Sequence, residues 1–185
     1  MTDATIEPGL QTAIFGGGCF WCLEAVFREV EGVRSVVSGY CGGHVESPTY
    51  RQVCSGGTGH AEVVKIEFDP AEVDYRKLLD IFFLIHDPTT RDRQGNDVGP
   101  QYRSVIFAQD EDQLHAALAV IEELGEQRVF PKAIVTRVER AAPFWPAEDE
   151  HQSYYENNSD MPYCQYVVAP KVAKYRARYP VRWKR

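Results

Sequence analysis

Residues 12–23 of this chain have the sequence TAIFGGGCFWCL. The apolar run at 12–15 predicts a β-strand, and the glycines at 16–18 end it. After the glycines, apolar residues recur at helical spacing and predict a helix that ends at Gly32; they are Cys22, Leu23, Val26, Phe27 and Val30. The pattern therefore places Cys19 in the first turn of a helix that follows a strand through a tight turn.

The apolar patterns in the rest of the chain predict further strands and helices. We predict strands at 33–38, 61–68, 103–108 and 133–138, and helices at 75–86, around 114–124 with Asp110 as N-cap, and near 147–157. The first six elements have the order β-α-β-β-α-β of the ferredoxin-like split arrangement. We therefore expect the α+β class, a two-layer sandwich with a ferredoxin-like β-α-β-β-α-β core plus C-terminal additions.

Length and composition indicate one folded domain over residues 1–185. Hydrophobic residues make up 44% of the 185 residues and charged residues 25%, which is ordinary for a globular protein. No apolar run is long enough to span a membrane, and the acidic start lacks the basic region of a signal peptide. The formal charge of -7 argues against general nucleic-acid binding. We expect a cytoplasmic monomer.

Residues 161–185 form a basic C-terminal tail in this interpretation. The segment contains no acidic residue, and its basic residues are Lys171, Lys174, Arg176, Arg178, Arg182, Lys184 and Arg185. A solvated tail lying against an acidic body is favoured over a binding arm.

The position of Cys19 favours a nucleophile. Unpaired N–H groups and the helix dipole favour an anion at a helix start, so we expect a lowered thiol pKa there. The glycines should leave the sulfur open to a substrate. Cys22, one turn later, fits both a redox pair with Cys19 and a core position, and the pattern does not choose between them.

Other chemistries fit the same segment less well. A phosphate-binding turn would need a G-x-G-x-x-G or G-K-[ST] spacing, which is missing. A zinc site would have to draw on scattered residues, because no second Cys-x-x-Cys or His pair is present; the candidates are Cys41, His44, Cys54 and His60. A thioredoxin-like domain has a different element order. A metal- or redox-responsive binding module and a thiol peroxidase remain as rival functions.

Glu62 is the candidate proton donor. On the strand at 61–68 it shares a face with Val64, Ile66 and Phe68, so it should point inward unless the strand frays at its start. A buried carboxyl has a raised pKa and can stay protonated to serve as a general acid. Other residues are ambiguous when taken singly: they are Tyr50, Tyr102 and Asp97 in loops, and Phe20 and Trp21, which could line a pocket or fill the core.

Four motifs in order resemble the peptide methionine sulfoxide reductases of the A type. They are Gly18-Cys19-Phe20-Trp21, Gly59-His60-Ala61-Glu62, Arg93-Gln94-Gly95-Asn96-Asp97 and Gln101-Tyr102-Arg103-Ser104, within a match from about Ala13 to Cys164. The resemblance implies reduction of methionine-S-sulfoxide, free or in peptides and proteins, without metal or other cofactor. It also implies thioredoxin as reductant.

The resemblance assigns a role to each motif residue. Cys19 would attack the sulfoxide sulfur and Glu62 would donate a proton to the oxygen. Tyr50 and Tyr102 would help to hold that oxygen. Phe20 and Trp21 would cradle the S-methyl group, with Asp97 at the rim near a backbone N–H of the substrate.

A second thiol must then resolve the sulfenic acid that forms on Cys19. Cys164 matches the position at which many relatives carry this cysteine, whereas many have glycine in place of Cys22. We favour Cys164 as main resolver because a tail can move, with a relay through Cys22 as the alternative. Cys41 and Cys54 are expected bystanders, and the setting of Cys54 suits a buried thiol.

Overall fold

The computed structural model describes residues 9–180. Its main sheet is six-stranded, with the order β7-β6-β1-β3-β2-β8. The strands are β1 Gln11–Gly16, β2 Val33–Cys41, β3 Ala61–Phe68, β6 Val105–Ala108, β7 Arg137–Arg140 and β8 Phe144–Pro146. β6 and β7 are parallel and every other pair is antiparallel, so the sheet is mixed. A separate hairpin pairs β4 Arg93–Gln94 with β5 Asp97–Val98.

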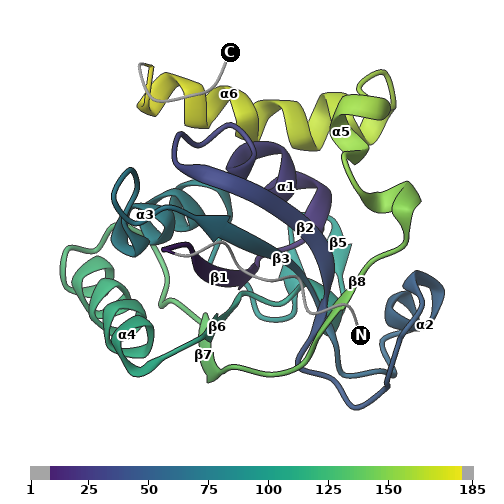
Figure 1. Cartoon of the computed structure of the whole chain (residues 1–185), viewed down its shortest axis with the longest axis horizontal. Helices are drawn as coiled ribbons and strands as arrows, with labels where there is room; N and C mark the ends of the chain where they lie inside the picture. Colours follow the sequence, from purple (N-terminus) through teal and green to yellow (C-terminus); the bar gives the residue numbers. More distant parts are fainter. Residues whose placement is uncertain (1–8, 181–185) are drawn as a thin grey trace.

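Helices cover one face of this curled sheet (Figure 1). α1 Phe20–Phe27, α3 Tyr75–Ile85 and α4 Glu111–Glu126 share one hydrophobic core with the sheet. α6 Ala169–Arg178 lies across α1 and α3 as an outer layer. The short elements are α2 Tyr50–Cys54, α5 Tyr154–Asn157 and the 3₁₀ turns η1 Pro100–Tyr102 and η2 Asp149–His151.

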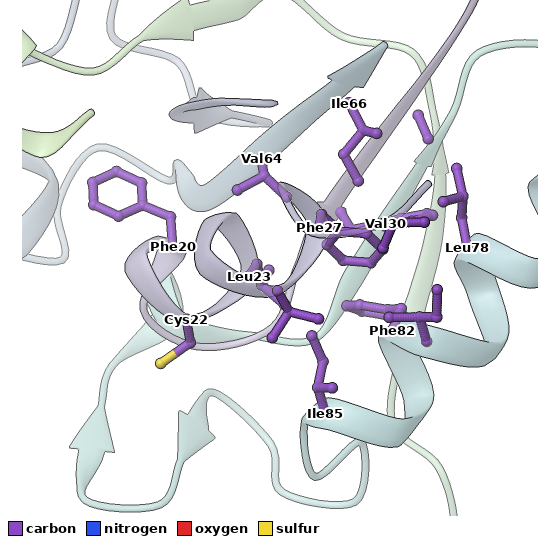
Figure 2. Packing of buried hydrophobic residues seen from close by; sticks show 14 of the residues in the cluster. Phe20, Cys22, Leu23, Phe27, Val30, Val64, Ile66, Leu78, Phe82 and Ile85 are labelled. Atoms are coloured by element: carbon purple, nitrogen blue, oxygen red, sulfur yellow. The ribbon is translucent and has the colours of Figure 1, made fainter. Parts of the chain in front are cut away.

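The core is built from aromatic and branched residues of β1, β3, α1 and α3. Figure 2 shows Val64 and Ile66 of β3 facing Leu23 and Phe27 of α1. Phe15 of β1 stacks on Phe82 of α3 at a centroid distance of 4.9 Å. Complete burial of each such side chain stabilises the fold by about 1.5–3 kcal/mol. This packing fixes α1, and with it Cys19, against the sheet.

The opposite face of the sheet carries a smaller apolar cluster. Ile14, Val63, Val105 and Phe107 are buried there, with Phe144 of β8 packed against them. Alternate residues of β1 and β3 thus serve the two clusters, as the period of a strand requires.

Most predicted elements are present, and Asp110 caps α4 by accepting a hydrogen bond from Gln113 N at 2.8 Å. The strand predicted at 133–138 is wrong in its bounds, because β7 begins only at Arg137. Val135 N donates instead to the carbonyl of Pro88, in a loop, so this apolar stretch joins no strand.

The segment from residue 161 is helical rather than an irregular tail. A π-helical turn at Cys164–Val168 continues into α6, and Val168, Val172 and Tyr175 are buried against the core. These three positions form a helical stripe that the basic composition of the segment obscures. Arg176 pairs with Glu29. Arg182, Lys184 and Arg185, which the sequence analysis assigns to the same basic segment, lie outside the described residues.

No helix within residues 9–180 has the length and apolar character required to cross a membrane.

The turn before Cys19 depends on glycine at position 18. Gly18 has φ +92°, and a Cβ there would lie 2.8 Å from Gln94 Cβ. Gln94 has little room to yield, because its amide makes hydrogen bonds with both Asp87 N and Asp87 O at 2.9 Å.

We therefore expect Gly18→Ala to lower the free energy of unfolding by about 2–4 kcal/mol, from backbone strain plus overpacking. The matched control is Gly95→Ala, which also has positive φ (+57°) but meets nothing within 4 Å. It should lose only about 1–2 kcal/mol. Urea unfolding measures both, and equal losses would contradict a buttressing role for Gln94.

Candidate active site

Cys19 is the N-cap residue of α1, directly after the turn that leaves β1. Its backbone is extended (φ -63°, ψ 129°), and its carbonyl accepts the first helical hydrogen bond, from Cys22 N at 3.1 Å. The sulfur accepts a hydrogen bond from Trp21 N–H and also makes one with the Glu62 carboxyl. The helix start therefore offers one N–H group, that of Trp21, to the sulfur, while Phe20 N donates to Glu62.

The predicted direction of the Cys19 pKa shift is nevertheless wrong. Cys19 is only 7% exposed, and burial raises the pKa of its thiol well above the usual value. The charges of Glu62 and Cys22 raise it further, while the bond from Trp21 N–H lowers it. A helix terminus is worth about 0.3–2 kcal/mol to an anion, whereas full burial can shift a pKa by 3–5 units, about 4–7 kcal/mol. Desolvation therefore wins, and the resting sulfur is a thiol.

Glu62 of β3 points inward, as the strand periodicity predicts. Its side chain is buried, and Oε1 accepts a hydrogen bond from Phe20 N at 3.2 Å. Oε2 is buried too and has no hydrogen-bond partner among the described residues. Burial raises the pKa of this carboxyl to about 8. Glu62 is therefore a protonated acid at neutral pH, beside the thiol and with one oxygen unused.

Tyr50 and Tyr102 lie near this pair from two different loops. Tyr50 begins α2 and Tyr102 ends η1. Burial raises the pKa of each phenol well above its usual value, and the charges of Glu62 and Cys19 add to the shift at both. Both hydroxyls therefore keep their protons and can donate hydrogen bonds around Glu62.

Glu148 and His151 hold Tyr50 in place, and the sequence analysis missed both. Tyr50 N donates to Glu148 Oε2 and Tyr40 OH donates to Glu148 Oε1, each at 3.0 Å. The His151 ring lies 4.1 Å from the Tyr50 ring. Both residues belong to the polar stretch predicted as a helix near 147–157, which instead forms the 3₁₀ turn η2 followed by α5. No apolar pattern in that stretch separates them from solvated residues.

Phe20 and Trp21 belong to an aromatic cluster next to Cys19. Phe20 is fully buried between Tyr40 and Tyr50, at centroid distances of 5.7 and 6.3 Å. Trp21 is half-buried and stacks on Tyr154 at 3.6 Å. The cluster supplies apolar surface beside the thiol, and Phe20 is also part of the core.

Asp97 is brought to the site by Tyr163, a residue that the sequence analysis missed. The Tyr163 hydroxyl donates to Asp97 Oδ2 at 2.7 Å and lies within hydrogen-bonding reach of both Cys19 and Cys22. Because a hydroxyl has one proton, it can donate to only one of these partners at a time. Tyr163 thus ties the β4-β5 hairpin, the start of α1 and the C-terminal segment together.

The five cysteines are all reduced and have different surroundings. Cys22 is fully buried, and Figure 2 shows its sulfur on the side of α1 away from β3. Cys164 is buried in the π-helical turn, and its charge acts on Cys22. Cys41 is buried in β2, where its thiol donates to Ala142 O.

The expected burial of Cys54 is wrong, because this thiol is exposed. The short helix α2 buries Val53 instead, and the next residue faces away from the core.

The structure also bears on the zinc alternative. In the described part of the chain one group of His, Cys, Asp and Glu side chains is close enough to share a metal ion: Glu148, Glu150 and His151. It contains no cysteine. His60 uses both ring nitrogens in hydrogen bonds, with Gly43 N and Val45 O.

Comparison with known proteins agrees with this arrangement. The family model for peptide methionine sulfoxide reductase matches residues 11–182. The peptide methionine sulfoxide reductase MsrA of Ralstonia nicotianae is 59% identical over 179 residues, covering 95% of this chain and 94% of the relative. The MsrA of Chromobacterium violaceum is 58% identical, covering 92% and 97%.

Solved structures show the same similarity. Reduced Mxr1 from Saccharomyces cerevisiae superposes with a TM-score of 0.80 at 32% identity, covering 85% of this chain and 91% of Mxr1. Methionine sulfoxide reductase A of Corynebacterium diphtheriae gives a TM-score of 0.75 at 34% identity, covering 86% and 80%. With the buried thiol and acid of the site, these matches lead to one conclusion: the chain belongs to the peptide methionine sulfoxide reductase A family and is an oxidoreductase that reduces methionine sulfoxide.

Proposed function

We propose that the chain reduces methionine-S-sulfoxide, free or in peptides and proteins, through a sulfenic acid on Cys19. The observation that carries this mechanism is the Glu62 carboxyl, protonated at neutral pH and hydrogen-bonded to the Cys19 thiol. The preference for the S epimer follows from family membership. The reaction as written needs no metal or organic cofactor.

The surroundings of Cys19 complement a methyl sulfoxide. Its polar S–O bond needs hydrogen-bond donors, which Glu62, Tyr50 and Tyr102 supply. Its apolar methyl group needs hydrophobic surface, which the rings of Phe20 and Trp21 supply. Asp97 is the acceptor for a backbone N–H of the substrate, so Tyr163 has to give up its bond to Asp97 when that N–H arrives.

The first step balances with these groups alone. The sulfur of Cys19 attacks the sulfoxide sulfur, and Glu62 gives its proton to the sulfoxide oxygen. The thiol proton is transferred to the Glu62 carboxylate. The attack forms a transient bond between the two sulfurs. Oxygen then passes to the Cys19 sulfur as this S–S bond and the S–O bond to the methionine sulfur both break. Methionine leaves reduced, and Cys19 is left oxidised as sulfenic acid.

The second step needs another thiol, and the structure supports a relay rather than direct attack by Cys164. Cys22 is one helical turn from Cys19, and the two thiols act on each other electrostatically. Cys164 lies in the π-helical turn that packs against α1, the helix that carries Cys22. Cys22 condenses with the sulfenic acid and releases water, and Cys164 then exchanges into the disulfide.

The π-helical turn that carries Cys164 supports its movement in this relay. Such turns are rare and often occur at functional sites, because their backbone hydrogen bonds are less favourable than those of an α-helix. Opening the turn would bring the buried Cys164 sulfur to the surface with the new disulfide. Thioredoxin then reduces that disulfide; Mxr1 from Saccharomyces cerevisiae, which is 25% identical to this chain with a TM-score of 0.59, has been solved in complex with Trx2.

We also propose that the sheet contains a ferredoxin-like core. The central order β6-β1-β3-β2, with antiparallel pairing throughout, supports a ferredoxin-like core extended by β7 and β8 at its edges. We propose one catalytic domain over residues 1–185, working as a monomer in the cytoplasm.

Cys19→Ser should abolish single-turnover reduction. Without added reductant, we expect the unmodified chain to form about one methionine per chain from the S epimer of a methionine sulfoxide peptide. The serine variant should form none, because its hydroxyl is a poor nucleophile. The measurement is methionine formed from the separated S and R epimers. Equal yields from the two epimers, or activity in Cys19→Ser, would contradict the proposal.

Glu62→Gln should slow the reductive step by about 10²–10⁴-fold, because an amide has no transferable proton. Because the raised pKa of Glu62 is about 8, its proton is present below pH 8 and is lost as pH rises through 8. The Glu62-dependent part of the rate constant should therefore fall above pH 8 and be missing in the variant. Glu67→Gln, on the same strand but away from the site, is the control. Rapid-quench single turnovers across this range provide the test.

The relay assigns different defects to the two resolving cysteines. Cys22→Ser should allow one turnover but leave sulfenic acid, which dimedone labels. Cys164→Ser should form the Cys19–Cys22 disulfide and lose most of its thioredoxin-driven recycling. The buried Cys41→Ser is the matched control. A Cys19–Cys164 disulfide at the normal rate in Cys22→Ser would show direct resolution by Cys164 instead.

A further inference from the structure

Three potential metal ligands lie together beside the site, at one end of β8. The 3₁₀ turn η2 Asp149–His151 and its preceding residue bring Glu148, Glu150 and His151 together. One ligand atom from each lies within 4.8 Å of the other two.

His151 has unmet hydrogen-bonding capacity within this group. The residue is 6% exposed, and neither ring nitrogen has a hydrogen-bond partner in the described part of the chain. Leaving a buried polar atom unpaired costs about 1–3 kcal/mol. The rings of Phe20, Trp21 and Tyr50 contact the imidazole, while its Nε2 lies 3.8 Å from Glu150 Oε1. The imidazole therefore directs a nitrogen at the carboxylates and has aromatic neighbours elsewhere.

The two carboxylates bring negative charge that no cation of the described residues neutralises. Neither Glu148 nor Glu150 forms an ion pair with a lysine or arginine there. Glu148 accepts one hydrogen bond on each oxygen, from Tyr40 and Tyr50, which leaves a second lone pair on each. Glu150 is exposed at its side chain, so it can adjust its position.

From this geometry we propose that Glu148, Glu150 and His151 bind one divalent transition-metal ion of the Zn²⁺ class. His151 Nε2 and one oxygen of each carboxylate are the ligands, and water completes the coordination. Imidazole together with carboxylate suits Zn²⁺ and its neighbours in the first transition row, whereas Mg²⁺ and Ca²⁺ prefer oxygen alone. Bonds of about 2.0–2.2 Å put two ligands at most about 4 Å apart. The 3.8 Å between His151 Nε2 and Glu150 Oε1 already meets this limit, and the exposed Glu150 side chain is free to adjust to the ion.

The site is separate from the reacting sulfur but shares residues with the support of Tyr50. Glu148 and His151 both contact Tyr50, and the ion would join them to Glu150. Binding would therefore stabilise this corner of the fold. The inference does not depend on the proposed function, because its test measures binding and not turnover.

The test is a Co²⁺ titration of the reduced, full-length chain, followed by visible absorption. We expect one equivalent of Co²⁺ to bind with d–d bands only, and Zn²⁺ to displace it. Glu150→Gln should weaken binding at least about 10-fold, the lower end of what loss of a supporting group costs a metal site. His151→Gln should abolish it. Glu126→Gln is the matched control: it removes an equal exposed charge on α4, which packs beside β7 at the opposite edge of the sheet, and should leave binding unchanged.

A second readout is the melting temperature, which Zn²⁺ should raise in the unmodified chain and in Glu126→Gln, but much less in Glu150→Gln. Glu150 is exposed, so its variant should fold even if His151→Gln does not. Binding that Glu150→Gln leaves unchanged would overturn the site. Bound Co²⁺ that shows only a thiolate charge-transfer band would also overturn it, because the ion would then be on the cysteines.

Discussion

The hydrogen bond from Phe20 N to Glu62 Oε1 joins the start of α1 to β3, and the arrangement of the site depends on it. It places a carboxyl at a helix terminus without exposing either group to water. Because Glu62 is paired with Tyr40 of β2 near the start of β3 and Phe20 is locked in the core, neither partner can move alone. Cys19 directly precedes Phe20 in the chain, so the same hydrogen bond keeps the Cys19 sulfur beside the Glu62 carboxyl.

Burial at this point decides the chemistry of both groups. Desolvation raises the pKa values of Cys19 and Glu62 together, so the resting pair holds both protons near neutral pH. A buried thiol is poorly reactive toward oxidants in general. In the proposed mechanism the substrate changes that balance, because its oxygen accepts a proton from Glu62 and the carboxylate that remains takes the proton of Cys19. Under this proposal the pair couples activation of the thiol to the presence of an oxygen that can be protonated.

The C-terminal part of the chain completes the site from the other side. Tyr163 contacts Asp97 and both thiols of the Cys-x-x-Cys pair, and Glu148 holds Tyr50. The buried carboxylate of Glu24 links α1 to the same region, since it accepts hydrogen bonds from Ser38 Oγ and Ser153 N. Residues far apart in the chain thus enclose the Cys19 sulfur together. The segment that carries Cys164 is part of that enclosure.

Local sequence patterns predict the individual strands and helices and identify the residues with intrinsic chemistry. The strand period favoured an inward Glu62 but left open a frayed strand start, and the glycines predicted Cys19 at a helix start, because both patterns depend on neighbouring residues. The burial of those groups and the residues around them depend on the packing of elements that are distant in the chain. The helix start predicted a lowered thiol pKa, but the packing of β3, α2 and the C-terminal segment removes water and raises it. Glu148, His151 and Tyr163 gave no signal for the same reason: their roles come from contacts with residues about 50 to 150 positions away, which no local period records.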